Sequence, residues 1–311
     1  MTVASIDIGS NTVLLLVARL DEKTRKITYS KTFYRVPRIS QGVKEDLSIS
    51  VKQETLLLEV LTEFQAIIKK FNCEVVLPVA TSAFRNAANA EYIVHKIKYL
   101  FGWETKILSG DEEASLTFFG ATFPFQNNEG KTVIDIGGGS TEVVFGNSNH
   151  ITYKKSFAIG VVSLFEKLLK GNPPLLKQLN KAINEVNKIL EPLNNIFSPF
   201  EAIAVAGTPT TLLCMKNKIR VFDDSLVDNK TLSRVEIESF RTELSALTYN
   251  QIKEKYGNVV EGREDVLLAG TIILERTMHI LQLNKVTVST KGLRFGVVYD
   301  YLTKTNNFSG M

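Results

Sequence analysis

The sequence predicts an α/β protein made of two similar halves, each a mixed sheet covered by helices. An apolar strand that ends in Asp-Ile-Gly and a small polar turn occurs twice, at Asp7 and at Asp135. The strands that follow recur as well, since ITYSKTF at 27–33 is echoed by ITYKKSF at 151–157. After each three-strand meander, short apolar strands alternate with helical segments, which is typical of α/β folds. A duplicated α/β unit explains all three observations.

The elements follow in order from hydrophobic period and turn residues. The meanders are expected at about 2–8, 12–20 and 26–35, and again at 131–137, 141–147 and 150–157. The rest of the first half is expected to contain helix 50–71, strand 75–80, helix 83–100, strand 105–108 and helix 111–123. The second half is expected to contain helices 159–170 and 175–196, strand 202–206, helix 209–217, helices within 232–256 and 263–282, strand 285–289 and a last helix from about 291.

We expect one lobe at 1–123 and a second at 124–296, with the C-terminal helix at about 297–311 able to pack back on the first. Two such lobes facing each other would leave a central cleft. Ligands of open α/β sheets bind at the carboxyl ends of the strands, and both Asp-Ile-Gly turns lie there. The alternative is two unrelated α/β domains with coincidental turns.

Composition describes a protein of ordinary globular character. Its 311 residues are 44% hydrophobic and 23% charged, which suits about two domains with ample core. The net charge of +4 comes without a dense Lys/Arg tract, so a nucleic-acid-binding arm is not expected. No apolar run reaches membrane-spanning length, and a strand begins by residue 3, so neither membrane insertion nor a targeting segment is expected. Cys73 and Cys214 lack metal-ligand spacing, and without a signal peptide they are interpreted as reduced thiols. Reduced thiols and the lack of a targeting segment together predict a cytoplasmic location.

Each glycine turn can present successive backbone N–H groups to a phosphate, because glycine lets the backbone approach closely. For either turn alone, an ordinary tight hairpin is the alternative. AGTPTTLL at 206–213 offers a third helix-start anion site, with Pro209 at the first helical position and plain capping as the alternative. The expected phosphate-binding residues are Gly9, Ser10, Asn11, Thr12, Gly137, Gly138, Gly139, Ser140, Thr141, Gly207 and Thr208.

Four charged residues are candidates for the chemistry. Glu113 opens a helix behind a predicted Ser109–Glu112 capping box, so it is free to act as a general base. Its alternative role is helix-end electrostatics. Arg85 follows strand 75–80 in a first helical turn, where a cation opposes the dipole unless it grips an anion; a solvated surface Arg is the alternative.

Asp135 ends an apolar strand, and Glu142 begins the strand that returns from the same turn. Two carboxylates beside a phosphate-binding turn suit Mg²⁺, which takes one or two carboxylates together with phosphate oxygens and water. A solvent-facing hairpin residue is the alternative for Glu142. An ungapped alignment of the repeats puts Leu14 at the position of Glu142, so the second turn is expected to hold the metal and the first mainly to grip phosphate.

The motifs DIGSNT, ATSAFRNAAN, SGDEEA, DIGGGSTE, AGTPTTL, GREDVLLAG and STKGLRFG occur in this order. With them, the chain resembles short, two-domain members of the exopolyphosphatase/guanosine pentaphosphate phosphohydrolase (Ppx/GppA) family over nearly its whole length. The resemblance implies two ribonuclease-H-like lobes of the actin, sugar-kinase and chaperone-ATPase superfamily around a central cleft. Departures are Thr12, where many members have Ser, and Phe295, where the family usually has Glu.

The resemblance also implies roles for single residues. Glu113 matches the base that activates water, and Asp135 and Glu142 match the acidic residues associated with Mg²⁺. Arg85 matches the arginine of the family's cleft, and Gly207-Thr208 matches the position where nucleotide-binding relatives meet the nucleotide.

The favoured function is therefore a hydrolase that releases terminal orthophosphate from inorganic polyphosphate, with Mg²⁺ as cofactor and Mn²⁺ as the alternative metal. The cations that could bind the rest of the polyphosphate chain are Arg35, Arg38, Lys291 and Arg294. Hydrolysis of guanosine pentaphosphate is the enzymatic alternative, and an actin-like, non-hydrolytic nucleotide switch is the alternative from another class. No nucleic-acid or membrane partner is expected, and a homodimer is left open.

Overall fold

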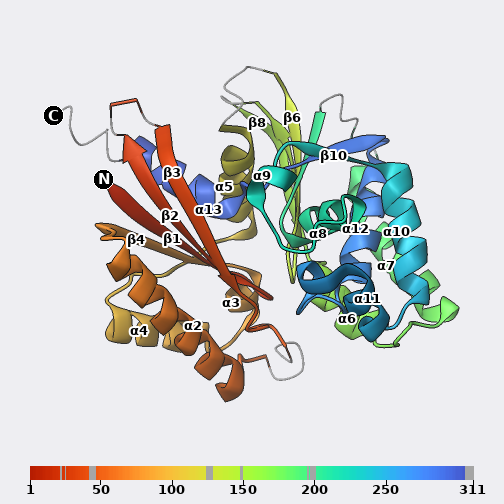
Figure 1. The fold of residues 1–311 in the computed structure, drawn as a ribbon, viewed down its shortest axis with the longest axis horizontal. Coiled ribbons are helices and arrows are strands. Elements are labelled where there is room, and N and C mark those ends of the chain that lie inside the picture. The colour runs from red at the N-terminus through yellow and green to blue at the C-terminus, as the bar shows by residue number, and fades with distance from the viewer. Residues whose placement is uncertain are drawn as a thin grey trace. The chain divides into compact units, whose positions relative to one another are not determined.

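The structure, a computed structural model, describes residues 1–21, 23–24, 26–41, 47–123, 129–147, 150–194, 196 and 201–304 (Figure 1). The chain forms two compact units. Unit 1 takes Met1–Gly120 together with the chain from Lys291 onward, and unit 2 takes Ala121–Thr290. Each unit contains one mixed sheet and its own helices, so the predicted α/β class is confirmed. The lobe boundaries expected at 123/124 and 296/297 stay predictions, and residues 305–311 of the expected last helix lie outside the described residues.

Unit 1 contains a five-stranded sheet in the order β3-β2-β1-β4-β5. Its strands are β1 (Thr2–Ile8), β2 (Val13–Asp21), β3 (Lys26–Arg35), β4 (Val75–Ala80) and β5 (Lys106–Ile107). The first three pair antiparallel as a meander, while β4 and β5 join in parallel to β1. The helices are α2 (Val51–Lys70), α3 (Ser82–Asn86), α4 (Ala90–Phe101), α5 (Gly110–Thr122) and α13 (Leu293–Lys304).

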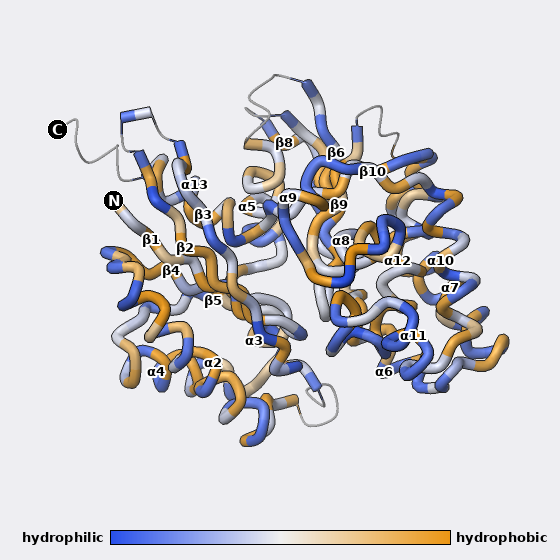
Figure 2. The backbone as a smooth tube through the Cα atoms, in the orientation of Figure 1, coloured by the Kyte–Doolittle hydropathy of each residue, from blue (hydrophilic) through white to orange (hydrophobic). Residues whose placement is uncertain are grey.

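Helices α2 and α4 lie together on one face of the unit 1 sheet (Figure 1). Helix α2 begins where the Ser50 hydroxyl accepts a hydrogen bond from the Gln53 N–H, and it ends on two lysines that suit the helix dipole. Its apolar stripe of Leu57, Leu61 and Phe64 is buried against the sheet. The alternation of apolar and polar stretches along both helices is visible in Figure 2, as expected for helices that cover a sheet on one side.

The helix expected at 83–100 is two helices, a correction with a local cause. Helix α3 stops at Asn86, because the next residue, Ala87, is extended (φ −96°, ψ 127°). Asn89 then uses its side-chain amide to accept from the Ile49 N–H and donate to the Ile49 carbonyl, both at 2.9 Å. This side-chain pairing with a distant backbone replaces helical hydrogen bonds there.

Helices α5 and α13 cross at three glycines. A Cβ atom added to Gly296 would overlap the Leu116 carbonyl of α5, and one added to Gly120 would overlap the carbonyl of Gly292. The two helix backbones are therefore in direct contact. Phe295 of α13 is buried, with 5% of its surface exposed.

Unit 2 contains a six-stranded sheet in the order β10-β11-β9-β6-β7-β8. Its strands are β6 (Lys131–Ile136), β7 (Thr141–Gly146), β8 (Ile151–Phe157), β9 (Glu201–Val205), β10 (Lys230–Ser233) and β11 (Lys285–Val288). Its helices are α6 (Val161–Leu168), α7 (Leu176–Leu190), η2 (Glu191–Leu193), α8 (Gly207–Lys216), α9 (Asp224–Val227), α10 (Arg234–Ala246), α11 (Tyr249–Tyr256), η3 (Gly257–Val260) and α12 (Leu267–Ile280). β10 and α9 have no counterpart among the predicted elements, and the helix expected to end at 196 ends at Leu190, followed by the proline-containing 3₁₀ turn η2.

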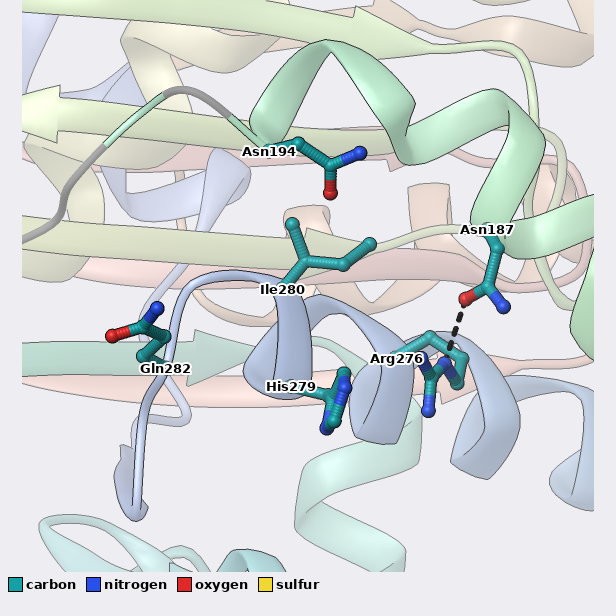
Figure 3. Close-up of a pocket in the computed structure, with 6 residues that line it drawn as sticks. All are labelled: Asn187, Asn194, Arg276, His279, Ile280 and Gln282. Atoms are coloured by element: carbon teal, nitrogen blue, oxygen red, sulfur yellow. Dashed lines mark hydrogen bonds between the residues drawn. The ribbon is translucent and has the colours of Figure 1, made fainter.

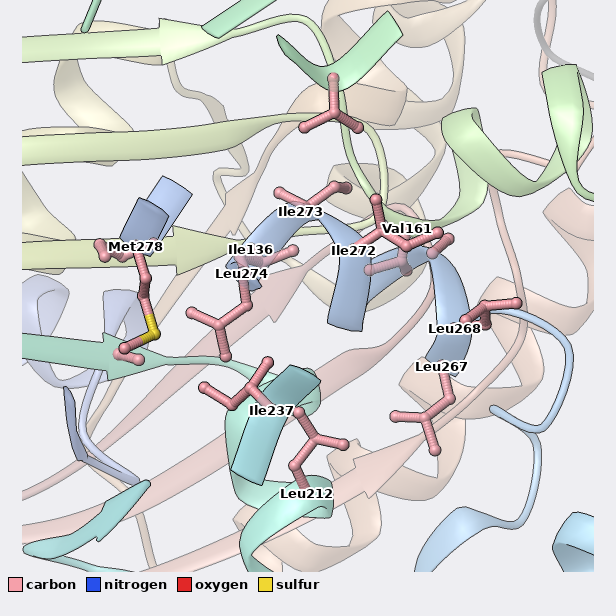
Figure 4. Packing of buried hydrophobic residues seen from close by; sticks show 14 of the residues in the cluster. Ile136, Val161, Leu212, Ile237, Leu267, Leu268, Ile272, Ile273, Leu274 and Met278 are labelled. Atoms are coloured by element: carbon pink, nitrogen blue, oxygen red, sulfur yellow. The ribbon is translucent and has the colours of Figure 1, made fainter. Parts of the chain in front are cut away.

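The core of unit 2 forms around α12, whose sequence LLAGTIILERTM is apolar on almost every side. Ile272, Ile273 and Met278 of this helix are fully buried, and Figure 4 shows them among Ile136 of the sheet and Leu212 of α8. A helix that is apolar all round must be covered all round, which explains why α12 is central. Within the described residues, no helix is both long and apolar enough to cross a membrane.

The two sheets repeat one topology, which confirms the duplication inferred from the sequence. In each, a three-stranded antiparallel meander is extended by parallel strands on the side of its first strand, β4 and β5 in unit 1 and β9 and β11 in unit 2. Unit 2 adds β10, which pairs antiparallel with β11. The register agrees as well, because Asp7 pairs with Leu14 in unit 1 and Asp135 pairs with Glu142 in unit 2.

Candidate functional site

The second glycine turn, between β6 and β7, is held by its carbonyl oxygens. Gly137 and Gly138 accept hydrogen bonds from the N–H groups of Val161 and Val162, at 2.9 and 2.8 Å. These donors are the first residues of α6, so the carbonyl oxygens of the turn bind the N–H groups at the start of that helix. Gly160 makes this approach possible, since a Cβ atom there would lie 2.5 Å from the Gly138 carbonyl.

The N–H groups in the middle of this turn differ from its carbonyl oxygens in their hydrogen bonding. Those of Gly138 and Gly139 donate to no acceptor within the described part of the chain, and both residues are only half-buried. A peptide plane held at its carbonyl oxygen presents its N–H to the opposite side. Adjacent unpaired N–H groups of this kind form an anion-binding concavity. The turn therefore has the geometry expected of a phosphate loop.

The first glycine turn, between β1 and β2, is closed by a hydrogen bond of 3.1 Å from the Gly9 N–H to the Thr12 carbonyl. The Ser10 hydroxyl is buried and bonds to nothing among the described residues. A buried hydroxyl without a partner costs free energy unless a ligand or water satisfies it. Ser10 is thus suited to bind a phosphate oxygen.

A neighbouring loop holds this turn in the same manner. The N–H groups of Arg38 and Ser40 donate to the carbonyls of Asn11 and Ser10, at 3.1 and 2.9 Å. The N–H groups of Ser10, Asn11 and Thr12 have no acceptor among the residues that the structure describes. Both turns therefore have bound carbonyl oxygens and unpaired N–H groups, although their supports, a loop and a helix start, are unrelated.

Asp135 and Glu142 project from one face of the unit 2 sheet, because they pair across β6 and β7. Glu142 is 1% exposed, and its Oε1 accepts a 2.6 Å hydrogen bond from the hydroxyl of Ser156 on β8. Their hard oxygen donors fit Mg²⁺. No group of three or more His, Cys, Asp or Glu suited to a metal occurs among the described residues.

Arg85 and Glu113 form an ion pair within unit 1. Arg85 Nη1 lies 2.5 Å from Glu113 Oε2 and 2.9 Å from the carbonyl oxygen of Leu108, which follows β5. Burial raises the pKa of the Glu113 carboxyl above its ordinary value, and the charge of Arg85 opposes that rise. Arg85 lies in the five-residue helix α3, and the anion that it binds in this structure is the carboxylate of Glu113. Its expected binding of a substrate anion stays a prediction.

The residue before Glu113 has the structural role that the sequence predicts. The Ser109 N–H donates to Glu112 and the Glu112 N–H donates to the Ser109 hydroxyl, at 2.9 and 3.2 Å. The ammonium of Lys106, with the Ser109 N–H and hydroxyl, lowers the pKa of Glu112 to about 2. The capping box is confirmed, and Glu113 takes no part in it.

At the third candidate turn, the structure differs from the expectation in detail. Helix α8 begins at Gly207, so Pro209 is its third residue and not its first. The side chain of Thr208 packs closely against Gly270 of α12. The guanidinium of Arg263 lies against Gly207, at the place a Cβ atom would occupy. Sequence reasoning missed Arg263, although it stands in the motif GREDVLLAG; only the fold shows that it reaches a glycine 56 positions earlier.

A pocket of about 420 Å³ lies elsewhere in unit 2 (Figure 3). It is lined by Asn187, Asn194, Arg276, His279, Ile280 and Gln282. Arg276 Nε donates to Asn187 Oδ1 at 2.7 Å. The end of α12 forms one side of the pocket, and the chain then enters β11. The pocket therefore lies near the amino ends of the parallel strands, whereas the glycine turn follows the carboxyl end of β6. No predicted site residue lines it.

Comparison with known proteins gives a consistent result. The sequence model described as Ppx/GppA phosphatase family matches residues 17–305. The chain is 30% identical to the bifunctional 3-dehydroquinate synthase/phosphatase of Fusobacterium nucleatum, over 96% of this chain but only 46% of that protein. It is 27% identical to exopolyphosphatase 2 of Mycobacterium tuberculosis, over 95% of this chain and 97% of the relative. It is 24% identical to the guanosine-5'-triphosphate,3'-diphosphate pyrophosphatase of Photobacterium profundum, over 97% of this chain and 59% of the relative.

Solved structures agree with these relatives. The Aquifex aeolicus member of the Ppx/GppA family is similar with a TM-score of 0.81 at 28% identity, over 98% of this chain and 99% of that one. An exopolyphosphatase from Cytophaga hutchinsonii is similar with a TM-score of 0.87 at 25% identity, over 98% of each chain. The predicted fold, which rests on the duplicated meander, is that of these proteins.

Proposed function

Because the chain belongs to the Ppx/GppA phosphatase family, we propose that it hydrolyses the terminal phosphoanhydride bond of inorganic polyphosphate and releases orthophosphate. A relative named exopolyphosphatase, matched over 97% of its length, supports this substrate. The observation that carries the proposal is the pair of glycine turns with bound carbonyl oxygens and unpaired N–H groups. Two such turns suit a substrate that consists of phosphate groups alone.

In the proposed mechanism, the N–H groups of the two turns stabilise the negative charge on the reacting phosphoryl group. Asp135 and Glu142 would hold Mg²⁺, which when bound supplies further positive charge to the phosphate oxygens. Glu113 accepts a proton from a water molecule whose oxygen forms a bond to the terminal phosphorus. The bond from that phosphorus to the bridging oxygen breaks, and its electron pair leaves with the shortened chain.

A second candidate substrate is guanosine pentaphosphate, which would use the same residues for its terminal phosphate. Two observations favour it: relatives with the pyrophosphatase name given above, and Arg263, which places a cation at the start of α8. The non-hydrolytic switch finds no such support, because the family is one of phosphatases. The homodimer and the cytoplasmic location stay predictions.

A released-phosphate assay tests the proposal. Polyphosphates of several lengths and guanosine pentaphosphate would be compared in parallel, with Mg²⁺, with Mn²⁺ and with a chelator. Glu113→Gln is expected to lower kcat by about 100-fold or more, since it removes the proton acceptor. Glu112→Gln is the matched control, because it changes the adjacent carboxylate, and it should keep kcat near wild type.

Each outcome of this assay has a distinct meaning. Wild-type protein that releases phosphate from neither substrate would overturn the proposed function. An active Glu113→Gln variant would overturn only the assignment of the base. Activity that survives complete chelation would remove the metal from the proposal.

A further inference from the structure

The guanidinium nitrogen that binds Glu113 has no capacity left for a substrate. Arg85 Nη1 carries two hydrogens, and the structure directs them to Glu113 Oε2 at 2.5 Å and to the Leu108 carbonyl oxygen at 2.9 Å. The side chain of Glu113 is only 9% exposed, and that of Arg85 is 21% exposed. The pair is thus held in a partly dry environment, where its attraction is much stronger than in water.

We propose that Arg85 is a positioning residue that exchanges partners during the reaction: it binds Glu113 in the substrate-free protein and moves to the substrate phosphate, which releases Glu113 to accept the proton of water. The inference rests on the proposed function, because it assumes that Glu113 is the base. It adds a regulatory property, since Glu113 reaches its full strength as a base only when substrate is bound.

The charges around Glu113 make Arg85 the controlling group. On its own helix, Glu112 faces away to Lys106 of β5 and to Ser109. From α13, Arg294 directs its Nε toward the Thr32 hydroxyl. The attraction of Arg85 is what opposes the rise that burial causes in the pKa of Glu113. Withdrawing that cation must therefore make Glu113 a stronger base.

A phosphate is a suitable competitor for the guanidinium. A terminal phosphoryl group carries more negative charge than one carboxylate, and it presents several acceptor oxygens to the planar fork of Arg. Glu113 that stayed charged and unpaired near the substrate would be costly. Uptake of the proton from the attacking water removes that charge, so the exchange favours the proton transfer that hydrolysis requires.

Separate pH profiles of kcat/KM and kcat test the exchange, because they report the free protein and the substrate complex respectively. In wild type, the acid-side midpoint of kcat is expected about one pH unit or more above that of kcat/KM. In Arg85→Gln the two midpoints should coincide at the higher value, and in Arg85→Lys the gap should shrink. Lys106→Gln, which removes the cation of the neighbouring Glu112, should keep the wild-type gap. Titration of the substrate itself is common to all four proteins and cancels.

Carbon-13 NMR of protein labelled at the Glu side-chain carboxyls gives a readout that needs no turnover. The signal that disappears in Glu113→Gln is the one to follow, with imidodiphosphate in the presence of Mg²⁺ as the probe. Saturating probe should raise the midpoint of Glu113 in wild type by about one pH unit or more and leave it unchanged in Arg85→Gln.

The two failures can be told apart. An unchanged Glu113 midpoint in wild type at saturating probe overturns the exchange of partners, and so do coincident kinetic midpoints in wild type. Absence of phosphate release from both polyphosphate and guanosine pentaphosphate overturns the proposed function, while the NMR titration still reports whether Glu113 and a phosphate compound compete for Arg85.

Discussion

Asp135 and Glu142 lie opposite each other across β6 and β7, in the register where unit 1 has Asp7 opposite Leu14. Unit 2 therefore presents two carboxylates beside its glycine turn, and unit 1 presents one. Ser156 adds a hydrogen bond of 2.6 Å to Glu142 from the next strand. The difference between the copies supports the expectation that the second turn binds the metal, while the first binds phosphate.

Substitution of Glu142 should weaken the response to Mg²⁺. We expect Glu142→Gln to raise the Mg²⁺ concentration for half-maximal phosphate release by about 100-fold, and Ser156→Ala by about 10-fold, since loss of a supporting hydrogen bond costs 10–100-fold in metal affinity. Mn²⁺ binding followed by electron paramagnetic resonance provides a second measurement. Glu201→Gln removes a carboxylate that pairs with Lys131 at the other end of β6, and it should behave as wild type. An unchanged Mg²⁺ response in Glu142→Gln would contradict the metal assignment.

Gly160→Ala should damage the second glycine turn. The new methyl group would lie 2.5 Å from the Gly138 carbonyl, so α6 and the turn would have to separate. We expect a loss of about 1–3 kcal/mol of unfolding free energy and a marked rise in KM for polyphosphate. Denaturant unfolding and the phosphate assay measure these two effects. A variant with wild-type KM would show that the approach of α6 does not shape the phosphate loop.

Gly296→Ala should destabilise unit 1 through the crossing of α5 and α13. Its methyl group would overlap the Leu116 carbonyl, where only backbone movement can make room. The expected cost is about 3 kcal/mol, at the upper end of overpacking. Gly102→Ala is the control, because Gly102 ends α4 in a left-handed conformation (φ 74°) with nothing within 4 Å of an added Cβ. It should cost about 1 kcal/mol, so equal losses would argue against the direct backbone contact.

Glu112 should make stability depend on pH in the acid range. Lys106 and the N–H and hydroxyl of Ser109 lower its pKa from 4.5 to about 2. The native state therefore binds fewer protons than the unfolded state between these values, and the contribution present above pH 4.5 is lost as the pH falls toward 2. The difference in melting temperature between wild type and Glu112→Gln should be greatest above pH 5, roughly, and should shrink toward pH 2. A difference that persists at pH 2 would assign the effect to hydrogen bonding that survives protonation.

Features with local causes were predicted well from the sequence. Strands β1–β3 and β6–β8 follow from apolar runs between Gly and Asn turns, and their repetition revealed the duplicated fold. The Ser109–Glu112 capping box is a four-residue pattern, and the structure forms it as expected. Each of these depends on residues that are close in the chain.

Features that depend on distant partners were not predictable in the same way. Strand β10 is the polar segment KTLS, and its pairing with β11, rather than its composition, makes it a strand. Arg85 meets a carboxylate 28 positions later, and Gly160 supports Gly138 from 22 positions away. Charge type and glycine content indicated that such residues matter, but tertiary contacts alone decide which groups they meet.

Helix α13 determines the order in which the two units are completed during synthesis on the ribosome. Unit 2 is one continuous segment, Ala121–Thr290, so all of it has been synthesised before the residues of α13 appear. Unit 1 is the first to start and the last to be completed, because its α5 lacks its glycine-lined partner until Gly292 and Gly296 emerge. The apolar surface that Leu293 and Val297 cover is exposed during that interval. Chains that end at Thr290 contain all of unit 2 but lack α13, so they should recruit chaperones through unit 1 and not through unit 2.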